Sequence, residues 1–163
     1  MAPPKRILVI NGEDEHMSRS LRSDCPIAAT LDIIGDRWTL LVLRDILIGG
    51  KSHFSEFAEG ESIASNVLTD RLNTLVDQEI IERLPDPDDG RKYIYRPLAP
   101  AIELLPVIAE LAAWGLKHST VDSPPDGNPL ADPATRKKLV DKLTRQLLAE
   151  PTQSQNDPTA LKG

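Results

Sequence analysis

The spacing of apolar and polar residues between Cys25 and about His118 predicts several helices, a hairpin and a last long helix. A first helix begins at Pro26 and ends at Gly35, because proline suits a first helical position and glycine a helix end. Asp36 can cap the second helix, WTLLVLRDIL. That helix is so apolar that we expect most of it to be buried, with Arg44 and Asp45 at its exposed edge.

Residues 51 to 78 predict a short helix, a turn and a longer helix. After the extended piece KSHF, Ser55 can cap a brief helix through about Glu59, and EGES makes the turn. The longer helix covers about residues 64–78 and has two different faces. Its apolar stripe consists of Leu68, Leu72 and Leu75, and the opposite side carries Asn66, Thr69, Asp70 and Asn73. We therefore expect one face in the core and the other available to a partner.

The segments IIERL and KYIYR predict two strands, joined by the turn sequence PDPDDG. A last long helix runs from Pro100 to His118, and Pro106 should bend it or delay its regular start. The apolar stripe of this helix has heptad-like spacing and consists of Ile102, Leu105, Ala109, Ala112 and Leu116. The sequence thus predicts a mainly α fold with a small β-hairpin (α+β).

Composition shifts divide the chain into five predicted regions. They are an N-terminal arm (1–24), a folded domain (25–118), a Pro-rich linker (119–133), a C-terminal helix (134–150) and a disordered tail (151–163). The order of elements in the folded domain is that of a winged helix-turn-helix. Because a fold does not dictate function, a DNA-binding protein and a winged-helix protein-interaction module are both open at this point.

Charge argues against a nucleic-acid partner. The formal net charge is −6, and residues 25–118 hold the whole excess, with nine basic against fifteen acidic residues. Nucleic-acid binders usually carry a basic surface, so only local clustering of cations could support DNA binding. No segment approaches the roughly 18 continuous apolar residues of a membrane span, and we expect a soluble, intracellular protein without membrane association.

Catalytic chemistry finds little support in the sequence. The three histidines, His16, His53 and His118, show no metal-ligand spacing, and no nucleophile elbow, phosphate loop or dinucleotide fingerprint is present. We therefore expect no catalytic residues, no metal, no cofactor and no enzyme activity.

Several motifs of the folded domain resemble the HxlR-type winged-helix transcriptional regulators of bacteria and archaea. They are CPIAATLDIIGDRWTLLVLRDIL, HFSEF, SIASNVLTDRLNTL, the glycine-tipped hairpin and LLPVIAELAAWGLKH, in the order and spacing of that family. The resemblance covers about residues 25–118. It implies a prokaryotic cytoplasmic homodimer, paired through long terminal helices, that binds double-stranded operator DNA and is nucleoid-associated when bound.

A recognition helix at about 64–78 would lie in the major groove, and a wing at 85–92 would contact the backbone. We expect the base contacts to come from Ser65, Asn66, Thr69 and Asn73. The expected phosphate contacts are Lys51, Ser52, His53, Arg91, Lys92 and Arg71. For Arg71 an ion pair within the chain is an equal alternative, because this residue sits beside the leucine stripe.

Cys25 is a candidate redox switch. It precedes Pro26 at a helix start, where unpaired amides and the helix dipole favour a thiolate. Some members of the resembled family use such a cysteine to sense oxidants or electrophiles, so a small-molecule or electrophile effector is a candidate partner. The alternative is a cysteine without a signalling role. Because Cys25 is the single cysteine, any disulfide would have to join two chains.

The helix at 134–150 places Leu139, Leu143 and Leu147 at i, i+4 and i+8, with basic residues on its other faces. It could pack on the dimer or rest near DNA, and we expect dimer packing.

Overall fold

The computed structural model describes residues 24–119 and 128–149. The predicted arm up to residue 23, the central part of the predicted linker and the predicted tail lie outside the described residues. The chain divides into two compact units, Met1–Arg96 and Pro97–Gly163. The five domain boundaries expected from the sequence stay predictions.

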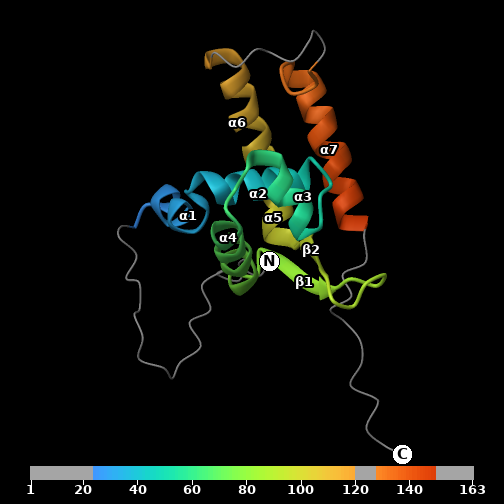
Figure 1. Cartoon of the computed structure of the whole chain (residues 1–163). Coiled ribbons are helices and arrows are strands. Elements are labelled where there is room, and N and C mark those ends of the chain that lie inside the picture. Colours follow the sequence, from blue (N-terminus) through green and yellow to red (C-terminus); the bar gives the residue numbers. More distant parts are fainter. Residues whose placement is uncertain (1–23, 120–127, 150–163) are drawn as a thin grey trace, which may run out of the picture. The chain divides into compact units, whose positions relative to one another are not determined.

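The first unit contains helices α1 (Pro26–Ile34), α2 (Arg37–Leu47), α3 (Phe54–Glu61) and α4 (Ser65–Asp77) (Figure 1). Asp36 caps α2, since its carboxylate accepts from the backbone N–H of Trp38 at 2.9 Å and of Thr39 at 3.2 Å. The predicted start at Pro26 and cap at Asp36 are therefore confirmed.

The predicted cap at Ser55 is wrong. α3 begins at Phe54, and His53 occupies the N-cap position. The carboxylate of Glu56 accepts from the backbone N–H groups of Ser52 and His53, both at 2.8 Å, so it satisfies amides at this helix start. The helix runs on to Glu61, and Ser62 (φ 53°) turns the chain toward α4.

The predicted exposure of Asp45 is also wrong. Asp45 is buried on α2, 6% exposed, because the two cations beside it cover its carboxylate. Lys51 Nζ lies 2.8 Å from Asp45 Oδ2, and Arg44 Nη2 lies 2.6 Å from Asp45 Oδ1. A buried carboxylate is tolerated in such surroundings because it is paired with charge.

Strands β1 (Ile81–Pro85) and β2 (Tyr93–Pro97) form the predicted hairpin (Figure 1). The extended piece before α3 lies along β2, where His53 bridges Ile94 and the N–H of Tyr95 donates to the carbonyl of Ser52 at 2.8 Å. The ring of Phe57 then meets Tyr95 edge-on at 6.2 Å. These contacts attach the start of the helix-turn-helix to the hairpin.

The predicted apolar face of α4 is the centre of this unit. Leu68, Leu72 and Leu75 are all 0–1% exposed, and α4 packs against α2, α3 and β1. The helix turns one side into the core, so its opposite side must face outward. α4 starts and ends within one residue of the predicted range 64–78.

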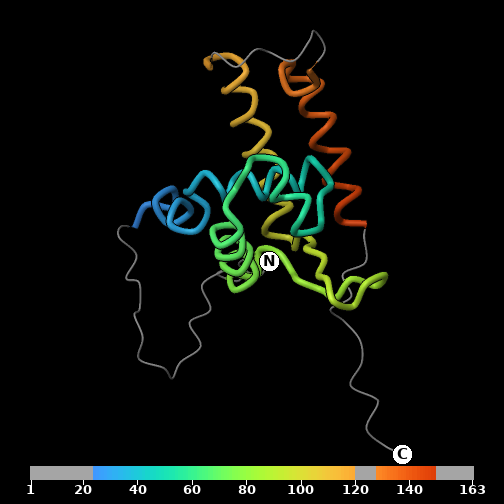
Figure 2. The backbone as a smooth tube through the Cα atoms, in the orientation of Figure 1, coloured from blue at the N-terminus to red at the C-terminus, as the bar shows by residue number. Residues whose placement is uncertain are grey.

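The second unit contains α5 (Ala99–Glu103), α6 (Leu105–His118) and α7 (Pro133–Ala149). The predicted delay at Pro106 is confirmed: the helix breaks at Leu104, and Pro106 falls in the first turn of α6, where a missing N–H costs little. α7 contacts α5 and α6 and returns alongside α6 (Figures 1 and 2).

By length and composition alone, the stretch Ala99–His118 could cross a membrane, with a mean hydropathy of 1.4. Glu103 and Glu110 interrupt it, which is why a count of continuous apolar residues does not detect it. One such stretch is weak support for a span, because core helices of soluble proteins share its composition.

Candidate nucleic-acid interface

The outward side of α4 carries the four residues predicted to contact bases. Ser65, Asn66, Thr69 and Asn73 are all exposed. The hydroxyl of Thr69 donates to the carbonyl of Ser65 at 2.8 Å, which fixes its position on the helix while its oxygen can still accept. The face is polar and carries an acidic residue, the exposed Asp70, and its amides and hydroxyls can pair with base edges.

The start of α4 differs from that of α2. Ala64 occupies the N-cap position of α4 and has no side-chain oxygen that could accept from the first-turn amides. Asp36 provides that oxygen in α2. The first turn of α4 is therefore suited to a phosphate oxygen.

Arg71 turns away from the polar face of α4 and toward the start of α2. Its Nε lies 3.4 Å from Asp36 Oδ1, so Arg71 forms the ion pair within the chain that was the alternative to a phosphate contact. Burial raises the pKa of Asp36, but the hydrogen bonds from Thr39 and Trp38 together with the Arg71 charge outweigh it and hold the pKa below its ordinary value. Arg71 thus ties α4 to α2.

Lys51 is likewise directed into the protein. Its ammonium pairs with Asp45, whose other oxygen accepts from Arg44, and Arg44 reaches Glu61 at 2.8 Å. Gly60 allows this arrangement, because a Cβ there would stand only 2.8 Å from Lys51 Nζ. The network fixes the end of α3 beside the end of α2, and it neutralises Lys51 locally.

His53 connects the start of α3 to the wing loop. Its Nε2 lies 3.0 Å from Asp86 Oδ2, and its Nδ1 lies 3.1 Å from Ser52 Oγ. The backbone N–H of Asp88 and the His53 ring lower the pKa of Asp86. Two of the predicted phosphate contacts, Ser52 and His53, therefore contact each other, and His53 also contacts the wing loop.

The wing tip presents the two predicted cations outward. The side chains of Arg91 and Lys92 are 91% and 66% exposed, and both approach Asp89, at 3.1 and 3.5 Å. The hydrogen bonds from Arg91 and the Lys92 charge lower the pKa of Asp89. A cavity of about 360 Å³ brings these residues together with the α3 start; its lining is His53, Phe54, Ser55, Arg91, Lys92, Tyr93 and Tyr95.

Two exposed cations were missed in the sequence. The Arg83 guanidinium lies 4.8 Å from the centre of the Tyr93 ring, across the hairpin, and Arg37 lies 4.3 Å from that of Trp38. Alternation along β1 could have placed Arg83 on the outer face of the hairpin, since Ile81 is buried and Arg83 is exposed.

Cys25 occupies the predicted place. It is the exposed N-cap residue of α1, with Pro26 next to it. Two apolar side chains of the same helix, Ile27 and Leu31, are 71% and 57% exposed. Within residues 24–119 and 128–149, no group of three His, Cys, Asp or Glu side chains could hold a metal ion.

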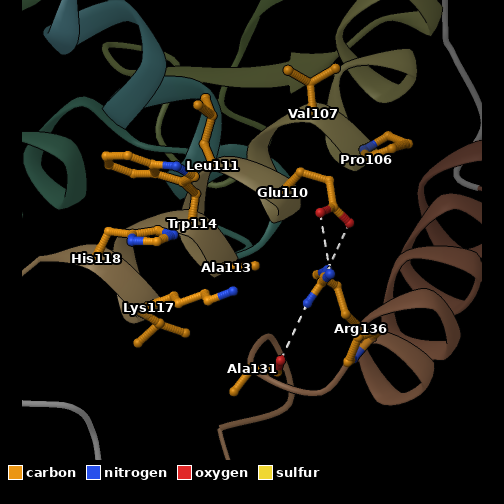
Figure 3. Close-up of a pocket in the computed structure, with 12 residues that line it drawn as sticks. Pro106, Val107, Glu110, Leu111, Ala113, Trp114, Lys117, His118, Ala131 and Arg136 are labelled. Atoms are coloured by element: carbon orange, nitrogen blue, oxygen red, sulfur yellow. Dashed lines mark hydrogen bonds and ion pairs between the residues drawn. The ribbon is translucent and has the colours of Figure 1, made fainter.

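The second unit exposes an apolar ridge on α6. Val107, Leu111 and Trp114 follow each other at i, i+4 and i+7 and are 49%, 51% and 66% exposed. They line an open groove of about 960 Å³, beside which Arg136 of α7 reaches Glu110 (Figure 3). The predicted stripe is a different one: its members Ile102, Leu105 and Ala109 are buried in the chain.

The family profile described as HxlR-like helix-turn-helix matches residues 33–123, more than half of the chain. The chain belongs to the HxlR-like family. The resemblance expected from the motifs, and the mainly helical winged-helix fold with its hairpin, are thereby confirmed.

Two HTH-type transcriptional regulators illustrate the similarity. The chain is 32% identical over 92 residues to YodB of Bacillus subtilis, covering 55% of this chain and 81% of YodB. It is also 32% identical over 89 residues to Rv3095 of Mycobacterium tuberculosis, covering 55% of this chain and 56% of that regulator. The chain thus spans little more than half the length of its mycobacterial relatives. Both relatives are regulators of transcription by name.

Solved structures agree with this HxlR-like membership. PA1607, a candidate transcription factor, superimposes with a TM-score of 0.57 at 31% identity, over 66% of this chain and 72% of that one. The redox regulator HypR in its oxidized form gives a TM-score of 0.54 at 29% identity, over 60% of this chain and all of HypR.

Proposed function

We propose that the protein is a homodimeric, sequence-specific DNA-binding transcriptional regulator of the prokaryotic cytoplasm. The observation that carries the proposal is the outward face of α4, where Ser65, Asn66, Thr69 and Asn73 stand exposed opposite a fully buried leucine stripe. α4 would enter the major groove by its N-terminal half, and asparagine amides there can pair bidentately with adenine.

Within the first unit, phosphate contacts would come chiefly from the wing. Arg91 and Lys92 are exposed, and the uncapped first turn of α4 adds backbone donors. Lys51, Ser52, His53 and Arg71 were expected to join them. Their ion pairs and hydrogen bonds within the chain support a structural role instead. These contacts attach α4 to the start of α2 and the start of α3 to the wing loop.

Pairing of two copies would use the α6 ridge of Val107, Leu111 and Trp114. Exposed apolar side chains at i, i+4 and i+7 suit packing against an equivalent helix, because each buried side chain of this size gains about 1.5–3 kcal/mol. A two-fold dimer presents two α4 helices, which doubles the base contacts and suits a palindromic operator.

The test is a gel-shift titration with duplex DNA from the gene's own upstream region, against unrelated duplex as competitor. Asn66→Ala/Thr69→Ala should lose selectivity for the upstream duplex, because each good base contact adds about 1–3 kcal/mol of discrimination. Thr74→Ala is the matched control: Thr74 makes the same 2.8 Å hydroxyl bond to the carbonyl four residues earlier, but on the half-buried side of α4.

If the double variant kept its selectivity, or if Thr74→Ala lost it equally, the choice of Asn66 and Thr69 as base contacts would be contradicted. An unaltered protein that binds no duplex would instead favour the winged-helix protein-interaction module.

Cys25 supports a second function, thiol sensing. It is exposed at the start of α1, and HypR, a structural neighbour at 29% identity, is a redox regulator. Two Cys25 thiols from two chains would form one disulfide while hydrogen peroxide is reduced to two waters. Peroxide should change the DNA affinity of the parent protein and produce a covalent dimer on non-reducing gels, and Cys25→Ser should do neither. Equal responses of both proteins would remove the switch.

A further inference from the structure

α7 combines two features that the HxlR-like match, which ends at residue 123, does not cover. Its half-buried side consists of Arg136, Leu139, Val140, Leu143, Thr144 and Leu147. This side packs against α5 and α6 of the same chain, and Arg136, 11% exposed, is fixed by Glu110 at 2.7 Å (Figure 3). The apolar side of α7 is therefore already occupied.

The outward side of α7 is basic. Lys138, Lys142 and Arg145 are all exposed and follow each other at i, i+4 and i+7, so they form one ridge directly opposite the packed side. Within the described residues no carboxylate lies within ion-pair distance of these three cations; Lys137, at the edge, pairs with Asp141 at 2.9 Å. The three cations of the ridge form no ion pair among the described residues, and the Nε of Arg145 donates to the backbone carbonyl of Asp141 at 3.1 Å.

Such a basic ridge is unusual in this chain. Residues 24–96, which contain the α4 face and the wing, hold eight basic and fourteen acidic residues, whereas α7 holds five basic residues and a single acidic one. Along the α7 axis Lys138 and Lys142 stand about 6 Å apart, and two phosphate steps of one DNA strand rise about 7 Å along the duplex axis. An anionic membrane fits less well, because the apolar side that would insert into lipid is packed on α5 and α6.

We propose that the ridge of Lys138, Lys142 and Arg145 binds the DNA phosphate backbone and supplies much of the sequence-independent affinity of an otherwise acidic regulator. The inference rests on the proposed DNA-binding function and extends it to a segment outside the family match. In this arrangement α4 selects the sequence, and α7 attracts the duplex whatever its sequence.

The test measures affinity against salt concentration for two duplexes of equal length, one from the gene's upstream region and one unrelated. Lys138→Gln/Lys142→Gln/Arg145→Gln should reduce the slope of log K against log salt by about 2.7 per chain on both duplexes, since each lost phosphate contact removes about 0.9. The ratio of the two affinities should stay unchanged. Circular dichroism should show the same helix content as in the parent.

Two single variants sharpen the result. Lys137→Gln removes the same charge from the same helix, but from a side chain already paired with Asp141, and should change the slope by less than about 1. Asp141→Asn should tighten the binding of both duplexes. Any of three results would overturn the inference. The triple variant could keep the parent's slope, or Lys137→Gln could change the slope as much as the triple variant does. The triple variant could also lose self-association in sedimentation while it keeps its DNA affinity.

Failure of the two proposals can be told apart. If the parent protein binds neither duplex, DNA binding and the α7 inference fall together. If Asn66→Ala/Thr69→Ala abolishes selectivity while the triple variant keeps the parent's salt slope, the regulator proposal stands and only the α7 inference is lost.

Discussion

The two compact units use their charged residues differently. In the first, five of the eight basic residues between 24 and 96 lie within ion-pair distance of a carboxylate; they are Arg44, Lys51, Arg71, Arg91 and Lys92. Several of these pairs join one element to another, as Arg71 of α4 does with Asp36 at the start of α2. Several charges of this unit thus join its elements, and the outward face of α4 carries an acidic residue, Asp70, among its amides and hydroxyls.

In the described part of the second unit, three outward cations, Lys138, Lys142 and Arg145, have no carboxylate within ion-pair distance. α6 exposes an apolar ridge, and α7 exposes a basic one, whereas Arg136 is the cation that holds the two helices together. The difference supports the proposed division of labour, in which the first unit would provide selectivity and the second would provide self-association and general attraction to a polyanion.

The largest expected effect is a loss of self-association that leaves the first unit folded. Leu111→Asp places a charge in the α6 ridge and should raise the dimer dissociation constant about 30-fold or more, since central apolar residues of an interface often contribute about 2 kcal/mol. Analytical ultracentrifugation measures it. Leu148→Asp is the control, because Leu148 on α7 is 62% exposed but lies outside the ridge. If Leu148→Asp raised the dimer dissociation constant as much as Leu111→Asp, the α6 ridge would not be a specific dimer interface.

A smaller effect would test the claim that charges in the first unit are structural. Asp45→Ala leaves Lys51 and Arg44 without their shared partner and should cost about 1–3 kcal/mol of unfolding free energy in urea. Glu61→Gln weakens an exposed pair with the same Arg44 and should cost less than about 1 kcal/mol. If Asp45→Ala left the unfolding free energy unchanged, the ion pairs of Asp45 with Lys51 and Arg44 would not contribute to stability.

Much of the fold could be predicted because it depends on local patterns. Asp36 as a cap, Pro26 and Pro106 near helix starts, and the leucines of α4 each act over four or five residues of sequence. The outward polar face of α4 followed from the same periodicity.

The parts that failed depend on partners distant in sequence. Asp45 is buried because Lys51 reaches back to it across the glycine turn, and His53 displaces Ser55 as the cap position because the chain before α3 pairs with β2. No spacing rule indicates which cations will be neutralised in this way. The phosphate contacts expected of Lys51 and His53 stay predictions, and the nearest charged groups of both residues in the structure are Asp45 and Asp86 of the same chain.

The smallest effect concerns the ion pair between Asp36 and Arg71, which joins the start of α2 to α4. Asp36→Asn keeps a capping oxygen but removes the charge, so at pH 7 it should cost a few tenths to about 1 kcal/mol of unfolding free energy.

The pH dependence gives this last variant its signature. The folded pKa of Asp36 lies below the ordinary value of 3.8, so the charged carboxylate stabilises the protein above that pH, and the contribution is lost as the pH falls through the folded pKa. The stability difference between parent and Asp36→Asn should therefore be full at pH 6–7, begin to shrink below about pH 4, and be lost once the pH is below the lowered folded pKa of Asp36, where both side chains are neutral. Urea titrations over this range measure it. A difference that stayed constant into acid would mean that Asp36 acts only through its capping oxygen, and that the charge of Arg71 is available to a phosphate after all.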